Sequence, residues 1–119
     1  MEAIDKRADE LGRLVGQSEE YQAWRRAEER LTADDALRKS LDHLAQLQVA
    51  AADKAERGEA PTPEQQAELD ALWSTVQVSP LYQTYIAART NFDKMMYRVN
   101  ETILNGMKKG SESRIITLG

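Results

Sequence analysis

The side chains that most often carry out chemistry are scarce in this sequence. His43 is the single histidine, and the 119 residues include no cysteine. Without cysteine there are no disulfides, thiolate zinc sites, cysteine-ligated iron–sulfur clusters or thiol nucleophiles. Metal sites inside helical bundles use paired Glu-x-x-His motifs on facing helices, and that motif does not occur. We therefore expect no metal and no cofactor, and we interpret His43 as a histidine at the solvent edge of its helix.

The sequence also predicts neither a hydroxyl nucleophile nor a phosphate-binding loop. A serine or threonine nucleophile needs an adjacent base, and the single histidine offers no obvious one. The segment Lys108-Lys109-Gly110-Ser111 lacks the G-x-x-x-x-G-K-[ST] spacing of a phosphate loop and follows a helix instead of opening one. We interpret it as a helix end with lysines that complement the helix dipole. No catalytic residues are predicted, and the protein is not expected to be an enzyme.

The spacing of apolar residues and the capping residues predict five helices. The fold class is therefore all-α, an elongated antiparallel helical hairpin or bundle that forms homo-oligomers. We expect a single helical domain over residues 1–109. The predicted helices cover about residues 2–15, 19–31, 34–57, a segment that begins at Pro63, and 80–108. Residues 110–119 are predicted to lose helical character, and to be mobile unless a partner holds them.

Two capping signals stand out. Thr62-Pro63-Glu64-Gln65 combines a helix N-cap, a proline at the first helical position and a glutamine at the third. The pattern Ser, two residues, Tyr-Gln, one residue, aromatic occurs twice, from Ser18 to Trp24 and from Ser79 to Tyr85. Independent capping followed by an aromatic anchor explains this echo. A duplicated helix start is the alternative.

One polar residue interrupts an apolar stripe. Gln48 lies near the middle of the stripe that runs from Leu37 to Ala55, where an apolar side chain is expected. A buried amide without partners costs roughly 1–3 kcal/mol. Gln48 is either partly exposed, or a device that sets register at a helix–helix interface, as single polar core residues do in coiled coils.

The predicted fifth helix is apolar on two sides. Its inner stripe follows Leu81, Tyr85, Ala88, Phe92, Met96, Val99 and Ile103. Ile86, Tyr97 and Leu104 line up roughly 120–140° around the helix from that stripe, and Tyr82 and Met107 border the gap between the two sides. Either the first two helices cover the second side within one chain, or the second side is an interface with another chain.

Helix length favours the interface. A helix of some 30 residues is about 45 Å long, which exceeds the diameter of a compact domain of this size. Rods of this kind bury their flanks by pairing, most often about a twofold axis.

The charge distribution indicates which classes of partner to expect. The net charge is −4, with 14 acidic against 10 basic residues in the first sixty and six of each in the remainder. Nucleic-acid binding needs a concentrated basic face, so we expect no direct binding to RNA or DNA. The N-terminus carries charges throughout, and no apolar run reaches the roughly 20 residues of a membrane span. We expect a cytoplasmic protein that does not associate with membranes.

With these residues in view, the sequence resembles the YlbF/YmcA family of small bacterial regulators over roughly residues 2–108. The resemblance lies in the Ser18-Glu19-Glu20-Tyr21 start, the Ala27–Leu31 stretch that leads to Asp34, and the proline turn before the fourth helix. It continues in Ser79-Pro80-Leu81 and in the residues that follow at matching spacing, which are Tyr85, Ala88, Phe92, Val99, Asn100 and Ile103.

This resemblance implies an all-α fold, homo-oligomers and a regulatory role. Relatives in Gram-positive bacteria act in complexes with one another and with further proteins, and support competence, sporulation and biofilm programmes. Links to RNA processing through an endoribonuclease have also been drawn. Some relatives hold iron–sulfur clusters through cysteines, and this sequence has none, so that cofactor does not carry over.

The leading hypothesis is a non-enzymatic adaptor or regulator that self-associates and presents helical faces to a protein partner. The interface candidates are Ile86, Tyr97, Leu104, Tyr82, Met107 and Gln48. The alternative is a structural or chaperone-like helical clamp that holds unfolded clients along its groove. One or two stoichiometric partners in a native lysate would favour the adaptor, and a broad mixture of clients would favour the clamp.

Overall fold

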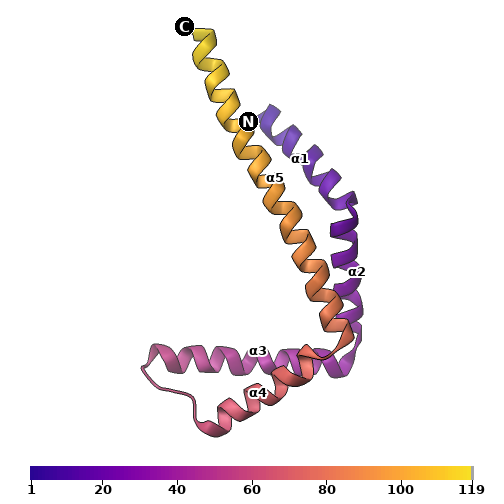
Figure 1. Ribbon diagram of the computed structural model, residues 1–119, viewed down its shortest axis with the longest axis vertical. Helices are drawn as coiled ribbons and strands as arrows, with labels where there is room; N and C mark the ends of the chain where they lie inside the picture. The colour runs from indigo at the N-terminus through magenta and orange to yellow at the C-terminus, as the bar shows by residue number, and fades with distance from the viewer. Residues whose placement is uncertain (119) are drawn as a thin grey trace.

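The computed structural model describes the backbone of residues 1–118 and the side chains of residues 1–113. It contains five helices: α1 (Glu2–Gln17), α2 (Glu19–Ala33), α3 (Asp35–Glu56), α4 (Pro63–Gln77) and α5 (Pro80–Leu118). Figure 1 shows an L: α2 and α5 lie side by side in a long arm, and the α3–α4 hairpin crosses its foot. The molecule measures 69 × 37 × 22 Å. The all-α fold and the elongated shape were predicted, and both are confirmed.

The starts of α2, α3, α4 and α5 each have a capping residue that the sequence indicated, whereas Met1 at the start of α1 makes no capping hydrogen bond with its side chain. The Asp34 side chain accepts a hydrogen bond from the backbone N–H of Leu37 at 2.9 Å. Thr62 and Gln65 form a complete capping box, in which each side chain accepts from the backbone N–H of the other residue. Such caps satisfy N–H groups that lack a partner within the helix. The helix boundaries therefore follow the sequence closely, apart from the end of α5.

The hairpin turns at the single residue with positive φ that the structure records. Gly58 has a φ of 74°, a conformation that glycine adopts without steric cost. The N–H groups of Gly58 and Glu59 bond back to the carbonyls of Ala55 and Lys54, at 3.0 and 2.8 Å. This is the Schellman arrangement that ends many helices, and it lets the chain reverse into α4.

The repeated serine–glutamine pattern forms two joints of the same construction. At the joint between α1 and α2, the Ser18 hydroxyl caps the N–H of Tyr21 at 3.1 Å, and Gln22 donates to the carbonyl of Gly16 at 2.8 Å. At the joint between α4 and α5, Ser79 caps the N–H of Tyr82 at 3.5 Å, and Gln83 donates to the carbonyl of Gln77 at 3.0 Å.

In each joint the serine starts one helix while the glutamine closes the end of the previous one. Both joints thus use the echoed residues for capping, and a duplicated helix start stays the alternative explanation.

The main core lies at the corner of the L, where α2, α3, α4 and α5 meet. Val76 is fully buried there, and Leu31, Leu37 and Leu44 surround it with little exposure. The partly buried side chains that pack against this cluster are Leu41, Leu69, Leu72, Leu81, Tyr82 and Tyr85. The corner thus fixes the hairpin to the beginning of the long arm.

The predicted end of α5 was wrong. The helix continues ten residues past Lys108, to Leu118. Gly110 costs a helix interior about 1 kcal/mol relative to alanine, which one isolated glycine does not turn into a stop, and no proline follows it. At 1.5 Å per residue, the 39 residues of α5 give a rod of about 58 Å. The mobility predicted for residues 110–119 stays a prediction, and residue 119 and the side chains from 114 onward lie outside the described part.

Candidate functional site: an uncovered apolar face on the long arm

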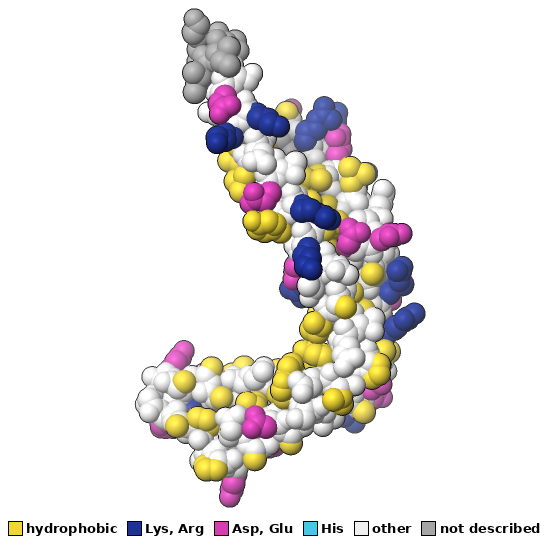
Figure 2. Space-filling model, in the orientation of Figure 1, with side chains coloured by type: hydrophobic (Ala, Val, Ile, Leu, Met, Phe, Trp, Pro, Cys, Tyr) yellow, Lys and Arg dark blue, Asp and Glu magenta, His cyan; other side chains and the backbone are white. Residues whose placement is uncertain are grey.

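Exposed apolar side chains concentrate at one end of the molecule. Eleven large apolar residues are exposed among those whose side chains are described, and seven of them lie on α1, on Met1 just before it, or on residues 97–107 of α5. These seven are Met1, Ile4, Leu14, Tyr97, Ile103, Leu104 and Met107. Figure 2 shows hydrophobic side chains along the distal part of α5. Contiguous apolar surface of this kind marks sites of association in soluble proteins.

The second side of α5 is uncovered in the single chain. The exposed fractions are 41% for Ile86, 67% for Tyr97, 55% for Leu104 and 63% for Met107. In the described residues, neither α1 nor α2 covers these four side chains, so the covering by N-terminal helices that the sequence left open does not occur. Their role as an interface stays a prediction.

Tyr82 occupies a different environment from the other four. It is half-buried and packs against the corner core. Its ring meets Trp73 of α4 edge to face, with 5.9 Å between centroids. Together with Ile86 and Ala87, these rings line an open groove of about 400 Å³ at the corner of the L, with Gln77 and Gln83 at its polar rim. Tryptophan and tyrosine side chains are typical anchors of protein interfaces.

A second groove separates α1 from the distal part of α5. No Cα atom of α1 lies within 8 Å of a Cα atom of α5 among the described residues, and Figure 1 draws α1 alongside the distal part of α5 but apart from it. The space between them is about 780 Å³, and apolar side chains on both walls dominate its lining, with Ile4 and Leu11 on α1 and Ile103 on α5. Ile103 was predicted on the covered inner stripe, but α1 stands too far away to bury it, and 45% of it stays exposed.

An aromatic cluster holds α2 against the proximal part of α5. Trp24 stacks on Phe92 with 4.9 Å between ring centroids, and Tyr21 lies 5.8 Å from the same Phe92 ring. The Arg89 guanidinium sits 5.2 Å from the Trp24 ring centroid, a cation–π contact. Hydrogen bonds to Tyr85 and Asp93 raise the pKa of Arg89 above its ordinary value, so this cation keeps its charge at every relevant pH.

Gln48 and His43 lie on the hairpin, away from α5. Gln48 is exposed on α3, about 100° around the helix from Leu47. This placement fits partial exposure, the first of its two readings, and no buried amide needs a partner there. His43 is half-exposed, as predicted, and its Nε2 lies 3.2 Å from Glu68 of α4. The pair links the two helices of the hairpin at its surface.

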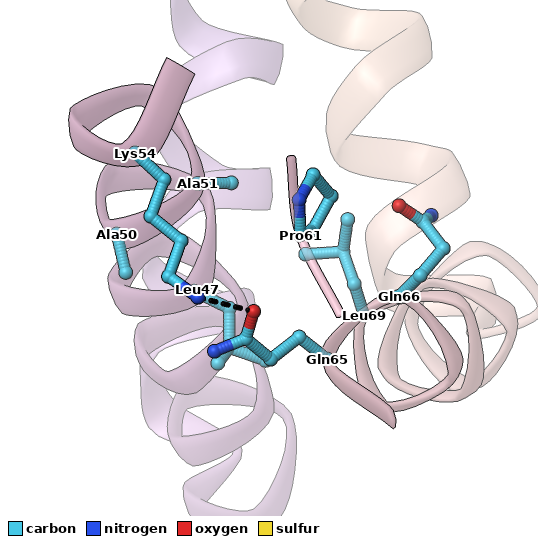
Figure 3. Close-up of a pocket in the computed structure, with 8 residues that line it drawn as sticks. All are labelled: Leu47, Ala50, Ala51, Lys54, Pro61, Gln65, Gln66 and Leu69. Atoms are coloured by element: carbon cyan, nitrogen blue, oxygen red, sulfur yellow. Dashed lines mark hydrogen bonds between the residues drawn. The ribbon is translucent and has the colours of Figure 1, made fainter. Parts of the chain in front are cut away.

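The hairpin also contains a small cavity near its tip. Figure 3 shows Leu47, Ala51, Pro61 and Leu69 around it, with the Lys54 ammonium donating to the Gln65 amide oxygen at 2.8 Å across one side. Its volume is about 50 Å³, whereas pockets for small organic ligands hold about 300–1,000 Å³. Lys54 and Gln65 therefore tie α3 to α4, and the cavity is a packing gap of the hairpin.

The described residues lack two further classes of feature, a metal-binding cluster and a membrane-spanning helix. No group of three or more His, Asp or Glu side chains there could hold a metal ion. No helix in that part of the chain is both long and apolar enough to cross a bilayer.

Sequence reasoning missed two parts of this site. The groove at Trp73 was not predicted, and 42% of that side chain is exposed. The groove between α1 and α5 was also missed, because it depends on how far apart the two helices stand. The small residues Ala3, Ala8 and Gly106 line its walls, and no spacing pattern in the sequence signals that separation.

Comparison with known proteins identifies a shared fold and a family. A solved protein of unknown function (DUF964) from Bacillus stearothermophilus has the same fold, with a TM-score of 0.67 at 17% sequence identity, covering 89% of this chain and 93% of that one. No protein with a curated description matches the chain. The family described as control of competence regulator ComK, YlbF/YmcA, matches residues 4–108. The chain therefore belongs to the YlbF/YmcA family.

Proposed function

We propose that this protein is a non-enzymatic regulatory adaptor, which self-associates through α5 and offers helical faces to a protein partner. The observation that carries the proposal is the exposed line of Ile86, Tyr97 and Leu104 along one side of α5. Membership of a family named for control of a competence regulator supports the regulatory part.

Leaving this line of apolar side chains in water is unfavourable. Burying a large apolar side chain contributes roughly 1.5–3 kcal/mol relative to leaving it exposed. Tyrosine and leucine on a rigid helix lose little conformational entropy on binding, because the helix already fixes their backbone. A second surface that covers these three side chains therefore gains free energy that the monomer does not use.

Introducing negative charges on the exposed side of α5 tests the proposal. The double variant Tyr97→Glu/Leu104→Glu places two carboxylates where a partner would exclude water, so the oligomer is expected to dissociate. Light scattering reports the mass, and far-UV circular dichroism should show that helicity is largely kept. A matched control, Val49→Glu/Val78→Glu, charges two apolar residues that are equally exposed but lie outside α5, and should leave the mass unchanged. A wild-type protein that is monomeric at tens of micromolar would refute self-association.

The second candidate function is a chaperone-like clamp for unfolded chains. The observation that favours it is the open groove between α1 and α5, which is apolar on both walls. A clamp would bind denatured proteins weakly and without fixed stoichiometry, whereas an adaptor would have one or two stoichiometric partners. Affinity capture from native lysate, followed by quantification of each captured protein, separates the two functions.

A further inference from the structure

The exposed side of α5 carries more than three apolar residues. Positions spaced alternately by four and three residues form one seam along the helix, and every one of them is exposed. The members of this seam are Ile86, Thr90, Asp93, Tyr97, Asn100, Leu104, Met107 and Ser111. A repeat of 3.5 residues is the spacing by which two helices pack along each other as a coiled coil.

Charges on and beside the seam distinguish the two directions in which a second copy could pack. In a parallel pair about a twofold axis, each residue meets its own equivalent. Asp93 would then face Asp93, and Lys94 would lie near Arg89 of the other copy, so like charges would meet twice. Like-charge contacts at an interface oppose association, which disfavours the parallel pair.

In an antiparallel pair the same residues become complementary. With Ile86 opposite Leu104 of the second copy, the register brings Tyr97 opposite Asp93, where the phenol can donate to the carboxylate. Thr90 then faces Asn100. At the edge of the seam, Lys94 lies beside Glu101 of the other copy, and twofold symmetry repeats each of these pairs.

In this register, the groove at the corner of the L lies opposite the distal apolar residues of the second copy. Leu104 and Met107 of the second copy arrive opposite Ile86 and Gln83, which are two of the residues that line the groove beside Trp73 and Tyr82. The α4 wall of this groove is formed by Trp73 and Gln77, and Asp70 lies one turn before Trp73 on the same helix. Lys108 and Lys109 follow Met107 and would approach this end of α4, where Asp70 carries the opposite charge.

We propose that two copies of this chain pack α5 antiparallel about a twofold axis near residue 95, with Leu104 and Met107 of each copy filling the Trp73–Tyr82–Ile86 groove of the other. This inference rests on the self-association proposed above and adds its partner, direction and register. It places the two hairpins at opposite ends of the paired rods.

Disulfide cross-linking tests the register directly, because the natural chain has no cysteine. The variant Ile86→Cys/Leu104→Cys is expected to form a covalent dimer under mild oxidation, since in this register each new thiol faces the other type of position in the second copy, and a disulfide forms only between residues whose Cβ atoms come within about 3.5–4.5 Å. Each single variant should stay uncrosslinked alone, and the two singles should cross-link when mixed. Asn91→Cys, on the far side of α5, is the matched control.

A charge exchange provides an independent measurement. Lys94→Glu and Glu101→Lys alone should each raise the dimer dissociation constant roughly five- to tenfold, because each breaks both symmetric pairs. The double exchange should restore it to near the wild-type value. Both side chains are exposed in the single chain, so folding should be unaffected.

The outcomes separate this inference from the proposed function. A dimer by light scattering, in which Leu104→Cys cross-links to itself or Asn91→Cys cross-links as fast as the double variant, overturns the antiparallel register and leaves self-association standing. A monomer without cross-links at tens of micromolar overturns both. Cross-links only between positions 86 and 104, with rescue by the charge exchange, establish the arrangement.

Discussion

The two halves of α5 belong to one continuous helix but have different surroundings. In residues 80–99 the inner stripe meets the corner core and the aromatic cluster on α2, and Ala88 is buried. In residues 100–118 no Cα atom of α1 comes within 8 Å, and Ile103, Leu104 and Met107 are all exposed. Both halves have apolar residues at helical spacing, so the pattern alone does not decide burial. A closely packed neighbour decides it, and the distal half has only the α1 wall of the open groove.

The largest expected effect comes from breaking the contact of the proximal half. Phe92→Ala removes the ring that stacks on Trp24 and contacts Tyr21. The free energy of unfolding should fall by about 3 kcal/mol, the lower end of the range for aromatic truncation, because Phe92 keeps some exposure. Urea titration followed by circular dichroism measures it.

The matched control for Phe92 lies on the same stripe in the distal half. Ile103→Ala, measured in the Tyr97→Glu/Leu104→Glu background so that self-association does not contribute, should cost less than about 1 kcal/mol, because Ile103 is already half-exposed. Equal losses at the two positions would contradict the contrast between the halves.

The corner core should show the next largest effect. Val76 is fully buried between the hairpin and the long arm, and Val76→Ala deletes two methyl groups, which should lower the free energy of unfolding by about 2 kcal/mol. Thermal unfolding at matched concentration checks this. A loss below about 0.5 kcal/mol would mean that the corner does not hold the proximal half in place.

A smaller change should stiffen the distal half. Gly110 is helical, and a Cβ built at this position meets no atom within 4 Å. Gly110→Ala should therefore favour the helix by about 0.5–1 kcal/mol. Amide hydrogen exchange at residues 108–113 should slow about two- to fivefold, while exchange at residues 85–92 should stay unchanged. Faster exchange in the variant would contradict a helical distal half.

The smallest effect is expected at the indole of Trp24. Its Nε1 is buried and has no hydrogen-bond partner among the described residues, and an unpaired buried N–H is unfavourable. Trp24→Phe removes that donor and keeps an aromatic ring against Phe92. The loss in the free energy of unfolding should stay below about 1 kcal/mol, well under that of Phe92→Ala. A loss as large as that of Phe92→Ala would show that the indole makes an unrecognised hydrogen bond.

Local chemistry explains what could be predicted from the sequence. Caps such as Thr62 with Gln65 act within four residues, so helix starts follow from short patterns. The second side of α5 was found from periodicity alone, which left open whether the N-terminal helices cover it, and the structure shows Tyr97 and Leu104 exposed. By contrast, the separation of α1 from α5 depends on the angle set at Ser18 and on packing at the distant corner. No local pattern contains that information, so the exposure of Ile103 was not foreseen.

The serine–glutamine joints also determine how length changes in the arms would act. Because Ser79 and Gln83 lock the first turn of α5 to the last turn of α4, α5 leaves the corner in a fixed direction. Inserting one residue after Val99 would rotate Leu104 by about 100° around the axis, whereas inserting four would return it nearly to its original azimuth and shift it outward by about 6 Å. The length of α5 can therefore evolve in whole helical turns without changing the direction in which the distal side chains point. A single inserted residue would instead turn those side chains to another side of the helix.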